Sequence, residues 1–177
     1  MPAGFVPFGD GWVSLGATVL AGAAGTTAVV EFTPMDMLMV HYLVTGYGGA
    51  GDIASLRFNG DSGANYWDRH LHSVAGGATF ANVVNVSTTL IRLAAVASTL
   101  QRSGIVQISN FRTTSKVCAI VNQTSTGAPG TSASLEAVGG GEWVNTAQQI
   151  RSITMITAAG ANLNAGSGFA IFGCNLS

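Results

Sequence analysis

The last third of the chain alternates between two kinds of side-chain position. The two sets are Ile150, Ser152, Thr154 and Ile156 on one side and Arg151, Ile153, Met155 and Thr157 on the other. A period of two is typical of a β-strand with two differently packed faces. Residues 169–172 form a second apolar run, and residues 158–166 between the runs are rich in glycine and asparagine. Because both residue types tolerate positive φ, we expect the chain to reverse there and the two strands to pair.

Similar short runs occur along most of the chain. They are rich in Val, Ile, Leu, Thr or aromatic residues, and Gly, Asn, Ser, Asp or Pro separate them, which favours strands joined by turns. The other expected strands are residues 12–20, 27–33, 37–44, 53–58, 66–72, 89–93, 105–108, 116–121 and 133–138. Helical composition occurs only at residues 90–100. Roughly ten to eleven short strands predict an all-β, single-domain β-sandwich or jelly roll.

Charged residues are rare in this chain. Only 8% of its 177 residues are charged and the net charge is -1, whereas about 25% are charged in an average soluble domain. So small a net charge attracts a polyanion weakly, so we expect no nucleic-acid partner. Because obligate interfaces are depleted in charged side chains, the composition indicates an assembly protein whose exterior is largely buried against other subunits.

The sequence predicts neither a membrane span nor a secretory signal. The longest strongly apolar stretch, residues 37–44, is far shorter than the ~20 residues that a helix needs to cross a bilayer. Residues 1–8 contain no basic residue and no long apolar block. We therefore expect no membrane partner and a protein kept in the cytoplasm until it is assembled or released. Cys118 and Cys174 lie in apolar runs and are expected to be buried and unpaired.

Three segments carry a resemblance to a known family. Residues 56–69 and 108–118 each read as strand, turn and strand, and Trp143 is followed by the glycine-flanked run of residues 166–173. Their order resembles that of tailed-bacteriophage virion structural proteins, which occur as capsid decoration or cement subunits, head fibres and tail-fibre modules. The resemblance covers residues 53–173 and implies a jelly-roll fold that is usually trimeric. It also implies a location on the virion, at the capsid surface, after assembly in the host cytoplasm.

Two functions of different classes follow from this resemblance. The first is a non-enzymatic capsid decoration protein that binds the outer capsid surface, with a homotrimer, the major capsid protein or other virion proteins as partners. The alternative is a head- or tail-fibre module that binds the host surface, where a host glycan is a possible partner. Strand-like patterning begins at Trp12, which leaves little room for a fibre shaft and favours decoration.

The first ten residues form an apolar arm ahead of the jelly-roll domain, which we place at residues 11–177. The prolines Pro2 and Pro7 disfavour continuous strand pairing there. The apolar side chains Phe5, Val6 and Phe8 are therefore expected to dock on an adjacent subunit or on the capsid lattice.

Trp67 and Trp143 complete the set of candidate interaction residues. Each can fill the core or a subunit interface, where tryptophan is enriched, or can stack on a sugar ring in a fibre module. The low charge of the whole chain favours the core or an interface.

A metal site is the first candidate for chemistry. Asp68, His70 and His72 share one face of an expected strand. Positions two apart in a strand spread the three side chains over about 13 Å, which is too far for a single ion. We expect a polar face that is hydrogen-bonded to neighbours. Asp61 lacks the spacing of a calcium loop and predicts an Asx-type turn instead.

The remaining candidates also lack the required pattern. Residues 46–52 are glycine-rich, but no Lys-Ser/Thr follows and the next segment reads as a strand instead of a helix. Glu136 and Glu142 are the nearest plausible carboxylate pair for glycoside cleavage. No Gly-x-Ser-x-Gly elbow occurs. We therefore predict no catalytic residue, no cofactor and no metal.

Overall fold

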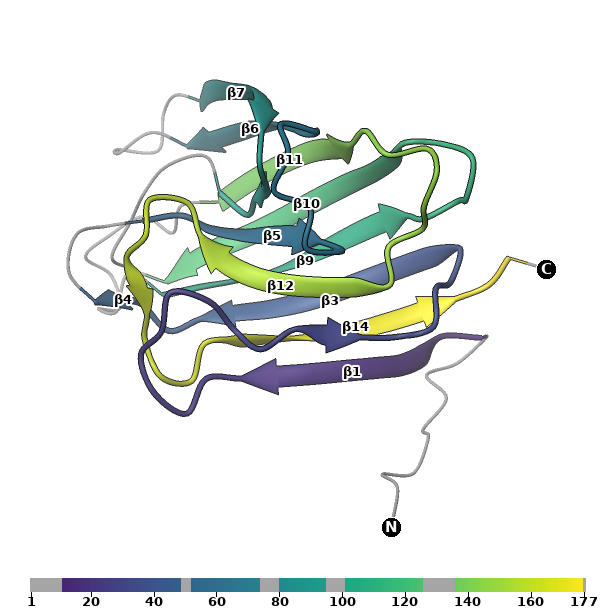
Figure 1. Cartoon of the computed structure of the whole chain (residues 1–177). Helices are drawn as coiled ribbons and strands as arrows, with labels where there is room; N and C mark the ends of the chain where they lie inside the picture. The colour runs from purple at the N-terminus through teal and green to yellow at the C-terminus, as the bar shows by residue number, and fades with distance from the viewer. Residues whose placement is uncertain (1–10, 49–51, 74–79, 95–100, 126–135, 177) are drawn as a thin grey trace, which may run out of the picture.

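The structure is a computed structural model, and it describes residues 11–48, 52–73, 80–94, 101–125 and 136–176. All regular elements in this part of the chain are strands. They form two facing sheets and a small two-stranded ladder (Figure 1). The predicted all-β sandwich is therefore confirmed. The described residues contain no helix of the length and apolar character needed to cross a bilayer.

The larger sheet contains eight antiparallel strands. In spatial order they are β1 (Val13–Val19), β14 (Gly168–Cys174), β3 (Met37–Val44), β9 (Gln101–Ser109), β10 (Lys116–Ser125), β11 (Glu136–Trp143), β6 (Tyr66–Ser73) and β7 (Phe80–Thr88). The smaller sheet contains four strands, which lie in front of the larger sheet in Figure 1. They are β2 (Val30–Glu31), β12 (Ser152–Thr157), β5 (Ala54–Phe58) and β8 (Ile91–Arg92). A short ladder joins β13 (Asn162–Leu163) to β4 (Tyr47–Gly48).

The core lies between the two sheets and is built from alternate positions of their strands. On β3, Leu38, Val40, Tyr42 and Val44 are buried and face inward. Ile153 and Met155 of β12 close the core from the smaller sheet. Burial of such apolar side chains is the main source of stability in a sandwich of this kind. The side of the larger sheet that faces away from the smaller sheet is called the outer face below.

Two expectations for the last two strands have different outcomes. The strands themselves are present as β12 and β14, but the prediction that they pair with each other is wrong. β12 pairs with β2 and β5 in the smaller sheet, and β14 pairs with β1 and β3 in the larger one. Residues 158–166 therefore cross from one sheet to the other, with Gly160 and Gly166 at positive φ and Leu163 buried between them. The two strands therefore belong to different sheets of the sandwich.

All eleven expected strands have a counterpart in the described residues, and β4, β7 and β13 were not expected. β7 contains Asn82 and Asn85, and asparagine is depleted in strands, which conceals the pattern. Of the segment with helical composition, residues 91–92 form β8, while residues 95–100 lie outside the described part.

The prediction of two buried, unpaired cysteines is confirmed, since Cys118 and Cys174 are both free and buried.

Candidate interaction surface

Phe5, Val6 and Phe8 lie outside the described residues, which begin at Gly11, two positions before β1. The expected docking of this arm therefore stays a prediction.

Trp143 belongs to the core. Its side chain is 0% exposed, and its ring lies 6.2 Å from that of Tyr66 and 5.9 Å from that of Phe58. Its indole Nε1 donates a hydrogen bond of 2.7 Å to Asp61 Oδ2. Because no part of the side chain reaches the surface of this chain, the structure removes Trp143 from the expected contact residues.

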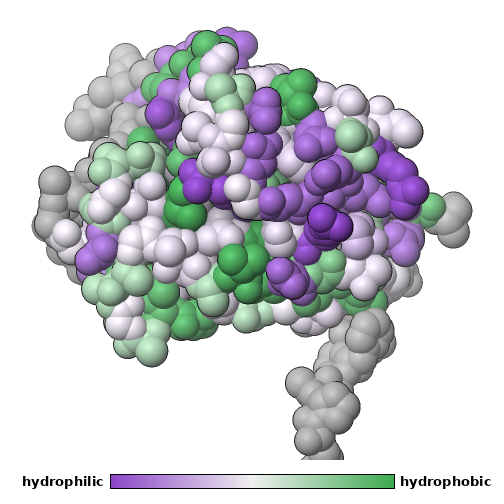
Figure 2. All heavy atoms as spheres, viewed as in Figure 1, coloured by the Kyte–Doolittle hydropathy of each residue, from purple (hydrophilic) through white to green (hydrophobic). Residues whose placement is uncertain are grey.

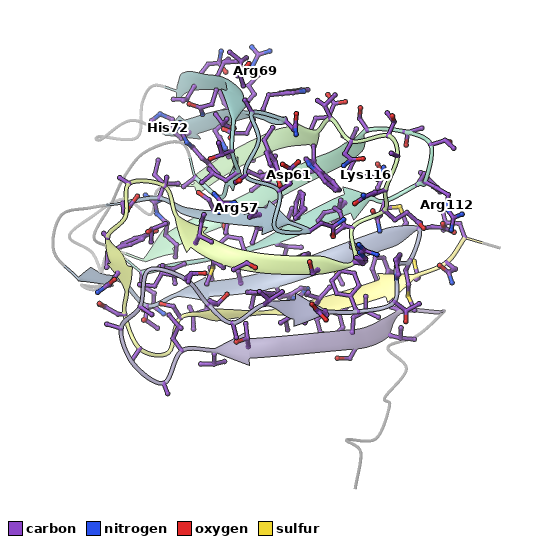
Figure 3. All side chains as sticks on the ribbon, viewed as in Figure 1. Arg57, Asp61, Arg69, His72, Arg112 and Lys116 are labelled. Carbon is purple, nitrogen blue, oxygen red and sulfur yellow. The ribbon has the colours of Figure 1, made fainter. Side chains whose placement is uncertain are left out.

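Asp61 connects this core to the turn before β6. Its Oδ1 accepts a hydrogen bond of 2.8 Å from the Gly63 backbone N–H, so the predicted Asx-type turn is confirmed. Partial burial raises the pKa of this carboxyl, but hydrogen bonds from Trp143, Asn65 and Gly63 outweigh burial and hold the pKa below its usual range. Asp61 and Lys116 lie at the same end of the sandwich (Figure 3). Lys116 is fully buried there, and its Nζ donates to the Thr114 and Asn145 carbonyls.

Trp67, in contrast, lies on the outer face. It is adjacent in the sequence to inward-facing Tyr66, and 37% of its side chain is exposed. The same face carries other large apolar side chains that are exposed. They are Leu43 of β3, Ile105 of β9, Val117 and Val121 of β10, Val138 of β11, Leu71 of β6 and Val84 of β7. Exposed apolar surface that extends over six strands is typical of an interaction site.

The opposite side of the molecule has a different character. On the exterior of the smaller sheet, Ser152 is paired with Glu31 and Thr154 with Arg57. Figure 2 shows hydrophilic residues gathered over one side of this face, and Arg57 lies in front of the sandwich in Figure 3. The two exteriors therefore differ in polarity, and the apolar one belongs to the larger sheet.

The outer face is organised in rows that run across the strands. In the first row, Ile105, Val121, Val138 and Leu71 are paired in succession across β9, β10, β11 and β6; we call it the valine ridge. In another row, Val117, Glu142 and Trp67 are paired across β10, β11 and β6; we call it the Trp67 ridge. Cross-strand pairs of this kind have Cβ atoms only about 5 Å apart, so each ridge is continuous.

A trough separates the two ridges. Its row contains Ala119, Gly140 and Arg69, and the ridges on either side are about 13 Å apart, the length of four strand residues. Because alanine and glycine leave little side-chain volume, the surface is hollowed there, and Trp67, Val117 and Val138 line the hollow. The trough ends at Arg69, whose position beside β7 is seen in Figure 3.

The three glycines of β11 are explained by different steric constraints. A Cβ on Gly139 would lie 2.5 Å from His70 Nδ1, and one on Gly141 would lie 2.9 Å from Ile91 Cδ1. These two glycines are therefore required by packing inside the sandwich. A Cβ on Gly140 would lie on the outer face, 3.2 Å from the Cys118 carbonyl oxygen, which demands a shift of only a few tenths of an ångström.

Two charged side chains lie on the outer face among the residues whose side chains are described. Glu142 Oε2 accepts a hydrogen bond of 2.5 Å from Trp67 Nε1. Arg69 Nε donates a hydrogen bond of 2.9 Å to Asn82 Oδ1. Both charges are thus held in place by neighbours, and they have opposite signs.

A second, smaller hollow lies where β1, β14 and β3 meet. Its volume is about 160 Å³, and Trp12, Met39, His41 and Phe172 line it. The ring of His41 lies 5.4 Å from that of Phe172 in an edge-on arrangement. This apolar lining adds to the neutral character of the same face.

The residues weighed as a metal site face the core instead. His70 Nε2 lies 3.2 Å from Asp68 Oδ1, and Asn85 Nδ2 donates to the same oxygen at 2.7 Å. His72 is also buried on this face of β6. The described residues hold no group of three or more His, Cys, Asp or Glu side chains arranged for a metal ion. The predicted hydrogen-bonded polar face is observed at Asp68, whereas the two ring nitrogens of buried His70 make no hydrogen bond within the described part of the chain.

Two further candidates are the glycine-rich segment and the carboxylate pair. Residues 49–51 of the glycine-rich segment lie outside the described part of the chain, and beside them the buried Asp52 carboxylate accepts hydrogen bonds from the Ile53, Ala159 and Ala161 backbone N–H groups. Glu136 and Glu142 stand at opposite ends of β11. Their separation of about 20 Å along the strand far exceeds the spacing of a glycosidase pair, about 5–9.5 Å.

Sequence reasoning missed the row structure of the outer face. The single available signal is the run Gly139-Gly140-Gly141 inside a strand, since glycine within a strand often marks a close approach of another backbone or ligand.

No known protein family matches the chain, and no curated protein sequence is significantly similar to it.

Proposed function

We propose that this protein is a non-enzymatic structural component of a phage virion, and that it acts as a capsid decoration protein. In this function it binds itself and the outer surface of the major capsid protein. The phage assignment comes from the sequence resemblance, and the structure supports the more general part of the proposal, that the chain works through protein contacts.

The observation that carries the proposal is the neutral, apolar outer face of the larger sheet. The valine ridge, the Trp67 ridge and the hollow at Trp12 lie on one side of one sheet, while Glu31, Arg57 and Arg151 lie on the exterior of the other. A soluble domain gains nothing from such an asymmetry by itself, but an assembly protein buries the apolar side and leaves the polar side in water.

The mechanism requires no turnover. Pressure from the packaged genome loads the joints between capsid subunits, and a protein bound across a joint adds interface free energy that must be lost before the shell opens. A specific contact of this kind needs about 1,000 Å² of buried surface or more. Several contacts within one oligomer strengthen binding through effective concentration.

A second candidate function rests on Trp67. Its exposed indole lies beside a carboxylate and near a guanidinium, from Glu142 and Arg69. A ring face flanked by planar polar groups is suited to a sugar, which stacks on the aromatic ring and binds the polar groups through its hydroxyls. This arrangement favours the fibre alternative, with a host glycan as ligand.

One deletion phage separates the two functions. If the protein is a decoration subunit, particles without it release DNA at a lower temperature and adsorb to host cells normally. Purified protein added back to these particles restores their heat resistance. If it is a fibre module, heat resistance stays intact and adsorption is lost, and that result would refute the decoration proposal.

A further inference from the structure

We propose that the trough on the outer face is the binding site for a second copy of this chain, related to the first by a twofold axis. The inference rests on the proposed function as an assembly protein. It adds the identity of one partner and the residues in contact.

Gly140 forms the floor of the trough. Glycine in the middle of a strand costs stability, and packing inside the sandwich explains Gly139 and Gly141 but leaves Gly140 with only a mild steric reason. The trough exists because this position has no side chain. Its floor is therefore available to a close neighbour on the outer face.

The two copies overlap over part of the outer face. Its eight strands, spaced about 4.8 Å apart, span about 38 Å. A twofold axis at the level of Cys118 brings residues 116–120 of β10 and the rows beside them into contact, and five residues at about 3.3 Å give at most about 600 Å² from each copy. The total of about 1,200 Å² exceeds the roughly 1,000 Å² that a specific contact requires.

The Trp67 ridge and the trough are complementary to each other. A twofold axis parallel to the trough, midway between the trough and the Trp67 ridge, places the ridge of each copy in the trough of the other. Val117 then lies over Ala119, Glu142 over Gly140, and Trp67 over Arg69 of the second copy. Each large side chain meets a small one or a cation, and the contact is self-complementary, as a twofold interface requires.

Charge supports the same pairing. Glu142 of one copy lies one strand away from Arg69 of the other, within reach of a salt bridge, and the reciprocal pair forms at the same time. Within one copy, the hydrogen bonds among the described side chains use Glu142 Oε2 and Arg69 Nε. Glu142 Oε1 of one copy and the terminal guanidinium nitrogens of Arg69 in the other copy are therefore the groups that would meet. Trp67 over Arg69 adds a cation–π contact. The two described charges on this face have opposite signs, so the face offers no electrostatic complement to a partner with a large net charge.

The test measures self-association of the purified full chain, without particles. Sedimentation velocity over a concentration series should give a mass of two protomers of 17.9 kDa for the wild type. Val117→Lys should weaken association by about tenfold or more. Val29→Lys is the matched control, because Val29 is 55% exposed and Val117 is 56% exposed, but Val29 lies beside β2, away from the outer face. It should associate as the wild type does.

The decisive experiment exchanges charges. Arg69→Glu and Glu142→Arg should each weaken association, because each places two like charges together. An equimolar mixture of the two variants should restore it, since the introduced carboxylate of one variant then meets the introduced guanidinium of the other, and the reciprocal contact keeps both native residues. Misfolding of either variant does not produce such a rescue. Gly140→Val should keep the melting temperature within a few degrees while it fills the trough and lowers association.

Several outcomes overturn the proposal. A wild type that is monomeric at all concentrations, or a mixture that shows no rescue, excludes the second copy. A stable trimer that none of these substitutions affects also excludes this twofold contact. Such a trimer would agree with the oligomeric state expected from the resemblance. If the wild type is monomeric but Val117→Lys abolishes particle binding, the face binds the capsid, so the proposed function stands and only this inference fails. Quenching of Trp67 by glycans in a monomer points to the fibre function instead.

Discussion

Replacing Asp61 by alanine is expected to destabilise the fold by about 1.5–4.5 kcal/mol. The larger part arises at Trp143, whose indole N–H loses its acceptor at 2.7 Å while the side chain stays fully buried. An unsatisfied buried donor costs about 1–3 kcal/mol. Loss of the hydrogen bond to the Gly63 backbone N–H, which lies in an exposed turn, adds about 0.5–1.5 kcal/mol. For a chain of this length, the sum corresponds to a decrease in melting temperature of about 3–18 °C.

A double-mutant cycle isolates the contribution of the buried pair. Trp143→Phe removes the N–H and keeps an aromatic ring beside Tyr66. In this background, Asp61→Ala should cost only the turn component, so the two substitutions should be non-additive by about 1–3 kcal/mol. Urea denaturation of the four proteins, followed by circular dichroism, gives the coupling free energy. Additive costs would show that the carboxylate and the indole do not stabilise each other.

The same site predicts a dependence on pH. The pKa of Asp61 is lowered in the folded protein, so its ionised form stabilises the fold above the unfolded pKa of about 3.9. This contribution is lost as the pH falls through the folded value. The stability advantage of the wild type over Asp61→Asn should therefore shrink below about pH 4. An advantage that stays constant down to the acid limit of folding contradicts the assignment of the shift to Asp61.

Two further predictions concern β11 and the arm. Gly139→Ala should destabilise the protein by about 1–3 kcal/mol in thermal unfolding, because the new Cβ would lie 2.5 Å from His70 Nδ1 and 2.7 Å from the Arg69 carbonyl oxygen; a melting temperature equal to that of the wild type would show that β11 shifts freely. Deleting residues 1–8 should leave a folded domain, since β1 begins at Val13, but should lower its occupancy on particles. Unchanged occupancy would refute the role of Phe5, Val6 and Phe8.

The sequence by itself was sufficient for local features. The period of two in residues 150–157 predicted β12, and the apolar run at residues 37–44 has the bounds of β3. The Asx-type turn at Asp61 and the burial of both cysteines were also predictable. Each of these depends on neighbouring residues along the chain, and such local preferences are written directly in the sequence.

Tertiary structure alone decided which sheet and which face each residue occupies. β12 and β14 looked like a hairpin because the connection between them can turn, but their edges are taken by β2, β5, β1 and β3. Trp67 and Trp143 looked equivalent, yet Trp143 is paired with Tyr66 in the core and Trp67 with Glu142 on the outer face. The alternation of apolar and polar residues indicates that successive side chains point to opposite faces of a strand. It does not indicate which of the two faces packs against the other sheet. That choice belongs to the long-range strand register, because a shift of one residue exchanges the two faces.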